Sequence, residues 1–355
     1  MAEQNLGPRD FFAKEDAIAD LGLIACPGAE ELCKLVDSHL VRWAREVGNT
    51  DVDTFIIPSD CPRFQSGDAK GLVKASTRGD DLYIFVDPGN YSVTYQLFGY
   101  ENHLSPDDHF QNLMRLIQAV AGRAHRISVI MPSLYGGRQH RRVSRESLDC
   151  AFALQQLRDV GVKNIITFDA HDPRVMNAVP TMSFDNVMPT YQVLKCLLHH
   201  VPDVSFHKDN FMIVSPDEGA MNRNMYYSSV LGCNLGMFYI IASGESMLDI
   251  AYELKMRGAR NIFTCCTFPL FTAGLEKFDK AYNDGIIKAV LGTNLTYRKP
   301  ELLEREWYYD VDVSKYTAYF IAAINHDKSV SSIIDPMTKI RTLLDKHGIP
   351  MGGEQ

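Results

Sequence analysis

Short apolar runs rich in β-branched residues alternate along the chain with longer segments in which apolar residues recur every three or four positions. Runs of the first kind predict buried β-strands, and segments of the second kind predict helices that bury one face. One such helix is expected over Ser147–Val160, with Leu148, Phe152 and Leu157 on its apolar face. Alternation of the two patterns is typical of α/β proteins with parallel sheets. The predicted strands are Thr54–Pro58, Leu82–Val86, Ile127–Met131, Asn164–Phe168, Phe211–Val214 and Ile262–Thr267.

A short pattern at the end of a predicted helix occurs twice. Gly161–Thr167 follows the helix just described, and Gly258–Thr264 follows a predicted helix over Met247–Arg257. Glycine is favoured directly after a helix, so each copy indicates a helix end that leads into a strand. Two similar α/β domains would explain the repetition, and chance explains it equally well because such turns are common.

The length of 355 residues suits about two domains of roughly 100–200 residues each. No linker rich in proline or serine marks a boundary between them. We place the boundary near Val179–Asn186, where Pro180 interrupts the pattern. This gives an N-terminal domain of residues 1–185 and a C-terminal domain of residues 186–355.

The composition is that of an ordinary globular protein, with 46% hydrophobic and 23% charged residues. It excludes a disordered chain, a collagen-like chain and a coiled coil. The 36 basic and 44 acidic residues give a net charge of -8, so broad binding to nucleic acid or to an anionic membrane is not expected. A local basic site for a small anion remains compatible with this balance.

The cysteines and the first residues of the chain favour a cytoplasmic protein. The 8 cysteines form no CxxC pair and no metal-ligand spacing, which predicts reduced and mostly buried thiols. Met1–Phe12 has no basic stretch that leads into an apolar one, so we expect no signal peptide. The most apolar run, Val230–Ala242, contains Asn234 and is too short to span a bilayer. We therefore predict a cytoplasmic location, without membrane or nucleic-acid partners.

The loop after the strand Ile127–Met131 is rich in arginine. Arg138, Arg141, Arg142 and Arg145 concentrate positive charge in an otherwise acidic chain, and two adjacent glycines free the backbone before them. Guanidinium groups bind phosphate through paired hydrogen bonds. A solvated surface loop is the alternative, but the position after a strand end favours an anion site.

Two further strand ends carry acidic residues. Asp169, His171 and Asp172 directly follow Asn164–Phe168, and this set suits a divalent metal or the positioning of a phosphate. A lone histidine is more often structural, so this turn is a weak indication by itself. At a later strand end, Asp217 could hold Mg²⁺ and a ribose-like diol, or it could simply complement a helix dipole.

A fourth loop consists of Ser243, Gly244, Glu245 and Ser246 and joins an apolar run to a predicted helix. Small residues at a helix start let backbone N–H groups and hydroxyls surround a phosphate. The loop is not a Walker A loop, because the Gly-Lys-Ser/Thr pattern is absent. In the other interpretation Ser246 only caps the helix, and Glu245 would repel an anion unless it points away.

Taken together and in this order, these segments resemble ribose-phosphate pyrophosphokinase (phosphoribosyl pyrophosphate synthetase). The resemblance covers most of the chain, and although each motif is modest, their common order is specific. The matching segments are Arg63–Asp68, the Arg138–Gln139 loop, Asp169–His171, Ser215–Gly219, Ser243–Ser246 and Thr293–Leu295.

The resemblance implies two phosphoribosyltransferase-like domains, each a mainly parallel sheet flanked by helices, with ATP on the N-terminal side and ribose 5-phosphate on the C-terminal side. The last helix would pack back on the first domain. The implied reaction transfers diphosphate from Mg-ATP to the anomeric hydroxyl of ribose 5-phosphate and releases AMP, in a homo-oligomer such as a dimer or hexamer. Such a transfer depends on metal and cationic groups more than on covalent chemistry, which agrees with the loops described above.

The same resemblance implies roles for individual residues, with the adenine often bound across a subunit interface. ATP would be bound by Phe64, Ser66, Asp68, Arg138 and Gln139, the first three of them at the adenine. His171 and Asp217 would be catalytic and would hold Mg²⁺. Ribose 5-phosphate would be bound by Asp217, Ser243, Gly244, Glu245 and Ser246.

The chain departs from the family pattern in several places. Asp68 stands where glutamate is usual, and His140 stands where aspartate is usual, so contacts around these positions are expected to differ. The family has a mobile basic segment with catalytic lysine and arginine, followed by a strand that ends in two adjacent aspartates. Here no lysine or arginine lies between Arg223 and Lys255, and no such aspartate pair precedes Ser243.

Two interpretations explain the missing segment. Either a stretch is absent from the printed sequence between Tyr239 and Ile240, or the chain has truly lost it and is a catalytically inactive homologue that acts as a regulatory or structural subunit. A true loss of a core strand would break the second sheet, yet the sequence after Ile240 still has an intact α/β pattern. We therefore favour the first interpretation and predict an active enzyme. A phosphoribosyltransferase is a weaker third possibility, since that chemistry needs no ATP pocket.

Overall fold

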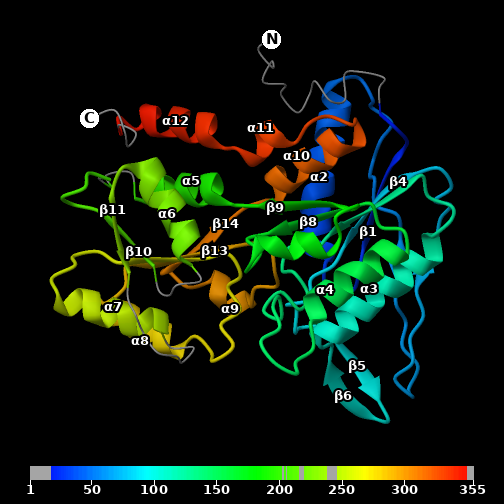
Figure 1. The fold of residues 1–355 in the computed structure, drawn as a ribbon, viewed down its shortest axis with the longest axis horizontal. Helices are drawn as coiled ribbons and strands as arrows, with labels where there is room; N and C mark the ends of the chain where they lie inside the picture. The colour runs from blue at the N-terminus through cyan, green and yellow to red at the C-terminus, as the bar shows by residue number, and fades with distance from the viewer. Residues whose placement is uncertain (1–16, 202–203, 205, 216–219, 238–245, 350–355) are drawn as a thin grey trace. The chain divides into compact units, whose positions relative to one another are not determined.

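The structure, a computed structural model, describes residues 17–201, 204, 206–215, 220–237 and 246–349 (Figure 1). The chain divides into two compact units that are each made from separate stretches of sequence. Unit 1 contains Met1–Met188, Asn294–Tyr297 and Val313–Ile334. Unit 2 contains Pro189–Thr293, Arg298–Asp312 and Asp335–Gln355. The predicted domain boundary between residues 185 and 186 stays a prediction.

Unit 1 is built on a parallel sheet with the strand order β1-β4-β7-β8-β9. Its five strands are β1 (Leu21–Ala25), β4 (Asp81–Phe85), β7 (Arg126–Ile130), β8 (Asn164–Phe168) and β9 (Ser183–Val187). All neighbouring pairs are parallel, for example Leu21 beside Asp81 and Asp81 beside Arg126. Most strand residues are buried on both faces, as expected for a parallel sheet covered by helices on each side.

Helices cover both faces of this sheet. The helices of unit 1 are α2 (Glu30–Glu46), α3 (Pro106–Val120), α4 (Asp149–Asp159), α10 (Ser314–Asn325) and α11 (Ser331–Ile334), with a 3₁₀ helix, η1 (Pro173–Ala178). Apolar residues of α3 and α4 share one buried cluster with strand residues such as Leu82 and Val129. Figure 1 shows α2 and α10 on the opposite side of the sheet, where they pack on each other.

Two small antiparallel hairpins lie outside the main sheet of unit 1. The first pairs β2 (Ser59–Asp60) with β3 (Leu72–Val73), and the second pairs β5 (Thr94–Leu97) with β6 (Tyr100–His103). The first hairpin encloses the loop of residues 61–71, and the second projects from the body of the unit below α3 in Figure 1.

Unit 2 contains two separate parallel sheets. One pairs β10 (Met212–Ser215) with β11 (Asn234–Met237), and the other has the order β12-β13-β14, formed by Phe263–Cys266, Ala289–Thr293 and Tyr308–Val311. Within the described parts of the chain, no strand joins the two sheets. The helices of unit 2 are α5 (Thr190–His200), α6 (Met221–Leu231), α7 (Ser246–Met256), α8 (Glu276–Asn283), α9 (Pro300–Leu303) and α12 (Met337–Lys346).

The α/β class with parallel sheets flanked by helices is confirmed, and five of the six predicted strands form within one residue of their predicted ends. Thr54–Pro58 is the exception, because it forms only a single parallel bridge between Ile56 and Leu23. This run lies beside the edge strand β1, where Leu23 donates its N–H to Phe55 and accepts one from Ile57, at 2.9 and 2.7 Å. The prediction of a full strand there is therefore wrong.

The predicted apolar face of the helix over residues 147–160 is wrong at Phe152, whose side chain is 62% exposed. The helix begins at Asp149, and its buried residues are Cys150, Ala153, Leu154 and Leu157. These four positions follow the helical spacing of three or four residues, so the helix is rotated away from the predicted face.

Both copies of the repeated pattern adopt the predicted helix end. Gly161 follows α4 with a φ of +98°, and Gly258 follows α7 with a φ of +92°. Each leads into a strand of its own unit, β8 or β12.

Among the described helices, none is both long enough and apolar enough to cross a bilayer.

Candidate functional site

The ends of β7 and β8 place two of the predicted loops side by side. These strands are parallel neighbours, so the arginine-rich loop after β7 and the acidic turn after β8 leave the same edge of the sheet. The loops are also joined at their base. Phe168 donates its N–H to the carbonyl of Pro132 at 3.0 Å, and the Thr167 hydroxyl donates to the same carbonyl at 3.1 Å.

His140 connects the arginine-rich loop to the turn after β8. Its Nε2 lies 3.7 Å from Asp172 Oδ2, and its ring centroid lies 4.8 Å from that of His171. The His140 and Asp172 side chains are only 12% and 13% exposed. Arg138 and Gln139 directly precede His140, so this contact ties the predicted ATP residues to His171. The sequence singled out His140 only as a departure from the family pattern and did not indicate this pairing.

Asp172 is held as an anion by its neighbours. Arg174 donates to both carboxylate oxygens, from Nη2 to Oδ2 at 2.6 Å and from Nε to Oδ1 at 2.9 Å. Hydrogen bonding from the Arg174 side chain holds the pKa of Asp172 well below its usual range, and the charge of His140 acts in the same direction. Because its oxygens already serve Arg174 and face His140, Asp172 is a poor candidate for an additional metal ligand.

The turn after β8 has an unusual backbone at Asp169. This residue has a φ of 49°, in the left-handed region that aspartate tolerates better than most other residues. The turn is fixed by neighbouring β9, since the Ala170 N–H donates to Asn186 Oδ1 at 2.8 Å. His171 follows and is exposed. The turn thus presents the imidazole at the surface of unit 1 from a fixed backbone.

The described residues do not by themselves form a Mg²⁺ site. In the part of the chain that the structure describes, no group of three or more His, Cys, Asp or Glu side chains is placed to hold a metal ion. Mg²⁺ prefers oxygen ligands, and the only described member of the predicted pair is His171. Its predicted partner, Asp217, lies outside the described residues.

The predicted adenine loop is a compact turn between β2 and β3. Phe64 accepts the N–H of Gly67 and donates its own N–H to Asp68, both at 2.8 Å. The Ser66 hydroxyl donates to Asp68 Oδ2 at 2.8 Å. The Phe64 side chain is 55% exposed. Two of the three predicted adenine residues therefore bond to each other, while the third presents an aromatic ring to solvent.

The first turn of α3 anchors both predicted ATP loops. Arg63, the first residue of the adenine loop, pairs with Asp108 at 2.7 Å, and Tyr135, in the arginine-rich loop, donates to Asp107 Oδ1 at 2.7 Å. Burial and the bond to Asp107 raise the pKa of Tyr135 to about 12, so the phenol keeps its proton at neutral pH. Adjacent residues of one helix thus bring together loops that are distant in sequence.

Sequence reasoning missed this role of α3, although the pattern that shows it is present. Ser105 and Asp108 form a capping box, in which the Ser105 hydroxyl accepts the Asp108 N–H at 3.2 Å and Asp108 accepts the Ser105 N–H at 3.0 Å. Serine followed three residues later by an acidic residue is a recognised signature of a helix start. It predicts the helix, but not the loops that the helix supports.

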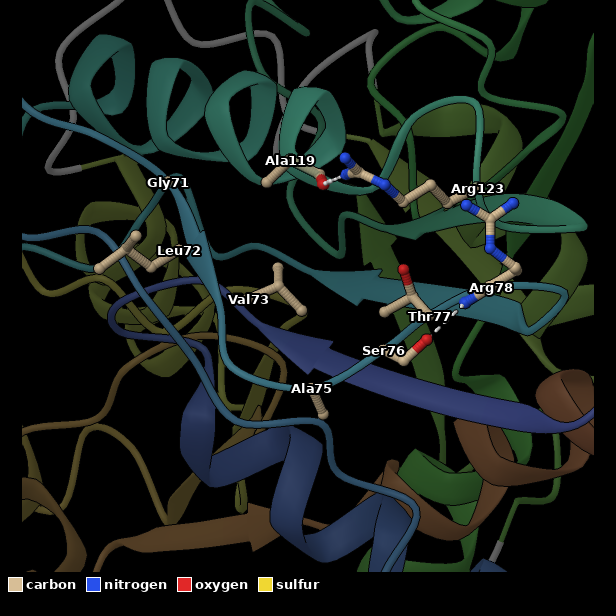
Figure 2. A pocket seen from close by; sticks show the side chains of 9 residues that line it. All are labelled: Gly71, Leu72, Val73, Ala75, Ser76, Thr77, Arg78, Ala119 and Arg123. Carbon is tan, nitrogen blue, oxygen red and sulfur yellow. Dashed lines mark hydrogen bonds between the residues drawn. The ribbon is translucent and has the colours of Figure 1, made fainter.

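A cavity of about 430 Å³ lies at the other end of α3 (Figure 2). Its lining residues are Gly71, Leu72, Val73, Ala75, Ser76, Thr77, Arg78, Ala119 and Arg123. In Figure 2 the guanidinium groups of Arg78 and Arg123 lie on the same side of the cavity, and Arg123 Nη1 donates to the Ala119 carbonyl at 2.9 Å. A helix of this length spans about 20 Å, so the cavity is distinct from the two loops at the helix start. No predicted site residue lines it.

The predicted ribose 5-phosphate residues fall almost entirely outside the described residues. These are Asp217, Ser243, Gly244 and Glu245. Ser246 is described and is the first residue of α7. Their roles stay predictions.

Comparison with known proteins gives a consistent result. Residues 21–161 match the model of the N-terminal domain of ribose phosphate pyrophosphokinase. The chain is 22% identical to the ribose-phosphate pyrophosphokinase of Staphylococcus aureus strain Mu50 over 307 residues, which cover 77% of this chain and 88% of that protein. It is 22% identical to the enzyme of the same name from Staphylococcus epidermidis over 351 residues, which cover 89% and 98%.

A solved structure shares the fold. The crystal structure of phosphoribosylpyrophosphate synthetase from Mycobacterium smegmatis superposes with a TM-score of 0.69 at 17% identity. The superposition covers 87% of this chain and 99% of that chain. At this identity the match establishes the α/β fold and not the activity.

Proposed function

This chain belongs to the family of ribose-phosphate pyrophosphokinases, and from that premise we propose that it transfers diphosphate from Mg-ATP to ribose 5-phosphate. The products are phosphoribosyl pyrophosphate and AMP. One observation carries the proposal for this chain: the arginine-rich loop, the His171 turn and the adenine-type loop are all tied to one sheet edge and one helix start in unit 1.

In this proposal ATP lies along the two loops that α3 anchors. Phe64, Ser66 and Asp68 contact the adenine, and Arg138 and Gln139 hold the phosphates. Arginine suits this task because its planar group donates paired hydrogen bonds to phosphate oxygens. The contact between His140 and Asp172 keeps the phosphate loop next to His171.

The reaction forms one bond and breaks another at the same phosphorus. The anomeric oxygen of ribose 5-phosphate bonds to the β-phosphorus of ATP, the bond from that phosphorus to the α–β bridging oxygen breaks, and AMP leaves. The hydroxyl proton passes to a base or to water. Negative charge spreads over the transferring group, so cationic side chains fixed in advance lower the barrier.

We place ribose 5-phosphate at Asp217 and at Ser243, Gly244, Glu245 and Ser246, as the resemblance implies. His171 and Asp217 are the proposed catalytic and metal residues. Mg²⁺ is expected to enter with the nucleotide, because it is commonly bound through one or two carboxylates together with substrate phosphates. Assembly into a dimer or hexamer and a cytoplasmic location belong to the same proposal.

The direct test incubates purified protein with ribose 5-phosphate and Mg-ATP and follows AMP. We expect AMP and phosphoribosyl pyrophosphate in equal amounts. Complete absence of AMP from the full-length protein, with ATP still bound, would contradict the proposed reaction. It would instead fit the catalytically inactive homologue, which is expected to raise or lower the activity of an active relative when the two are mixed.

Asp217→Ala provides a residue-specific test. We expect turnover to fall by about 100-fold or more, since general acid–base and metal-binding groups contribute on this scale. Asp53→Ala is the matched control, because the Asp53 side chain is 92% exposed and pairs only with Arg45 among the described contacts. Equal activity of the two variants would remove Asp217 from the site.

A further inference from the structure

The hairpin of β5 and β6 exposes two aromatic side chains at its tip. Phe98 is 75% exposed and Tyr100 is 76% exposed, whereas most other aromatic side chains of unit 1 are buried or half-buried. The hairpin projects from the unit instead of packing on the main sheet (Figure 1). Water-exposed aromatic rings at a projecting tip bring no burial to the fold, and apolar side chains that are exposed together mark interaction or ligand-binding sites.

The backbone of the turn makes Phe98 a costly choice. The turn contains two residues, Phe98 and Gly99, with φ of 49° and 86°. Such turns favour Asn-Gly or Asp-Gly, because both residues need a positive φ. A bulky side chain in this region is an outlier, and strained residues of this kind cluster at ligand-binding sites. Phe98 gains no compensating burial.

The hairpin is attached to the predicted adenine loop. The Phe98 N–H donates to the carbonyl of Gln65 at 2.9 Å. Leu97 packs so close to Gly67 that an added Cβ on the glycine would lie 2.8 Å from Leu97 Cδ1. Arg63 lies 4.2 Å above the centre of the Tyr95 ring. These contacts at three points make the hairpin and the loop one structural element.

The register of the hairpin determines which face meets the loop. Tyr100 is paired with Leu97, and directly opposite residues of an antiparallel pair lie on the same face. Tyr95 and Leu97 share that face by alternation, and both contact the adenine loop. Tyr100 therefore lies on the face of the hairpin directed toward the loop that carries the exposed ring of Phe64.

We propose that Phe98 and Tyr100 form a stacking surface for the purine ring of the nucleotide held by the Arg63–Asp68 loop. The inference rests on the proposed function, because it takes that loop to bind the base. Purine rings stack on aromatic side chains, while the phosphates are left to the arginine-rich loop. The strain at Phe98 is then explained by placing a ring beside the base.

The exposed rings are by themselves too small to form an interface with a second copy of the chain. A fully buried aromatic side chain covers about 150–250 Å². The rings of Phe64, Phe98 and Tyr100 therefore offer a few hundred Å² at most, roughly, below the ~800 Å² per partner of a stable interface. A flat purine needs no larger surface.

Phe98→Asn separates the two roles of this residue. Asparagine suits the left-handed turn, so we expect the melting temperature of the full-length variant to stay the same or rise. We expect the dissociation constant for Mg-ATP to increase at least about fivefold, which is the lower end of the effect of removing a base-stacking ring. Tripolyphosphate has no base, and its dissociation constant is expected to stay unchanged. Tyr100→Thr, which suits a strand, is the second variant, and Phe152→Gln on α4 is the matched control.

Each outcome decides the proposal. Unchanged affinity for ATP in both variants overturns it, as does equal weakening for ATP and tripolyphosphate. Unchanged ATP affinity with a smaller sedimentation coefficient assigns the aromatic tip to a second copy instead. Wild-type protein that binds ATP no better than tripolyphosphate also overturns it. If AMP forms normally while the variants bind ATP as wild type does, only this inference fails. If the base-dependent loss appears but AMP never forms, only the proposed reaction fails.

Discussion

Asp81 shows how a single buried charge organises unit 1. Its side chain is fully buried at the start of β4, and Arg126 donates to both of its oxygens at 2.8 Å. Tyr83 and Asn325 add hydrogen bonds at 2.9 and 3.0 Å. Asn325 lies in α10, far along the chain, so this carboxylate connects the first sheet strands to a helix near the C-terminus.

Asp81→Asn is expected to destabilise the protein by about 3–5 kcal/mol, because the largely buried guanidinium of Arg126 then keeps only the exposed Asp327 as a counter-charge. Urea denaturation measures the change. Asp53→Asn is the control, with a loss of at most about 1 kcal/mol, since the pair of Asp53 with Arg45 is exposed. Equal losses in the two variants would show that burial of the pair does not matter.

His109 introduces a dependence on pH. It is fully buried and bonds through Nε2 to the Asn90 carbonyl at 2.6 Å. Burial lowers its pKa, although the carbonyl and nearby Asp108 oppose this. Below the unfolded value of about 6.5 the unfolded chain binds more protons than the folded one, so the free energy of unfolding falls as the pH drops.

The variant His109→Gln can keep a donor to Asn90 but does not titrate. We expect its free energy of unfolding to lose less than that of wild type between pH 7 and pH 5. Urea midpoints at a series of pH values measure this difference. Parallel curves for the two proteins would mean that His109 does not contribute.

At the residue scale, the sequence predicted which residues lie at strand ends better than it predicted which side chains they contact. It predicted that Arg138 and His171 would each follow a strand, and the parallel pairing of β7 with β8 places those two strand ends side by side. The contact of His140 with Asp172 was not predictable, because it depends on how two loops fold over each other. Loop conformations follow from tertiary contacts more than from local pattern.

At the element scale, α3 supports much of unit 1. Its start holds the two proposed ATP loops through Asp107 and Asp108, and its middle fills the core with Leu113, Leu116 and Ile117.

The alternation of short apolar runs with helical patterns predicted β7 and β8 correctly, because each of these strands is a short buried run. The orientation of α4 that exposes Phe152 was missed. In a short helix, two neighbouring sets of positions can fit the helical spacing, so the sequence pattern does not determine which set is buried.

Ser105→Ala removes the cap of α3, and we expect a loss of about 1 kcal/mol in stability. Because the same turn holds both proposed ATP loops, the KM for ATP should also rise, with a smaller change in kcat. Ser38→Ala in the middle of α2 is the control, where the hydroxyl only bonds back to the Leu35 carbonyl at 2.7 Å. A rise in KM for both variants would indicate a general loss of stability.

At the scale of the whole molecule, the described strands of unit 2 fall into two separate sheets. Its described strands form one sheet of two strands and one of three, and no strand joins them. The sequence lacks the basic segment and the aspartate pair that the family has at this point of the chain, between β11 and α7. A strand with such a pair would come after β11 and before α7 in chain order, between the strands of the first sheet and those of the second.

We expect the intact protein to have a mass above the 40.0 kDa of the printed chain. The printed chain predicts one uninterrupted tryptic peptide from Asn224 to Lys255, because no lysine or arginine lies inside it. An additional basic segment would divide this peptide, and peptide mass mapping detects the difference. A mass of 40.0 kDa with the peptide intact would contradict our expectation and support the inactive homologue.

Unit 1 also has a consequence for how the protein is made. Its sheet is complete by Met188, but α10, which packs on α2, belongs to the stretch that ends at Ile334. Synthesis at roughly 5–20 residues per second leaves on the order of ten seconds between these points. During that interval α2 lies on its side of the sheet without α10, so the apolar surface that α10 later buries is exposed on the ribosome-bound chain and accessible to chaperones.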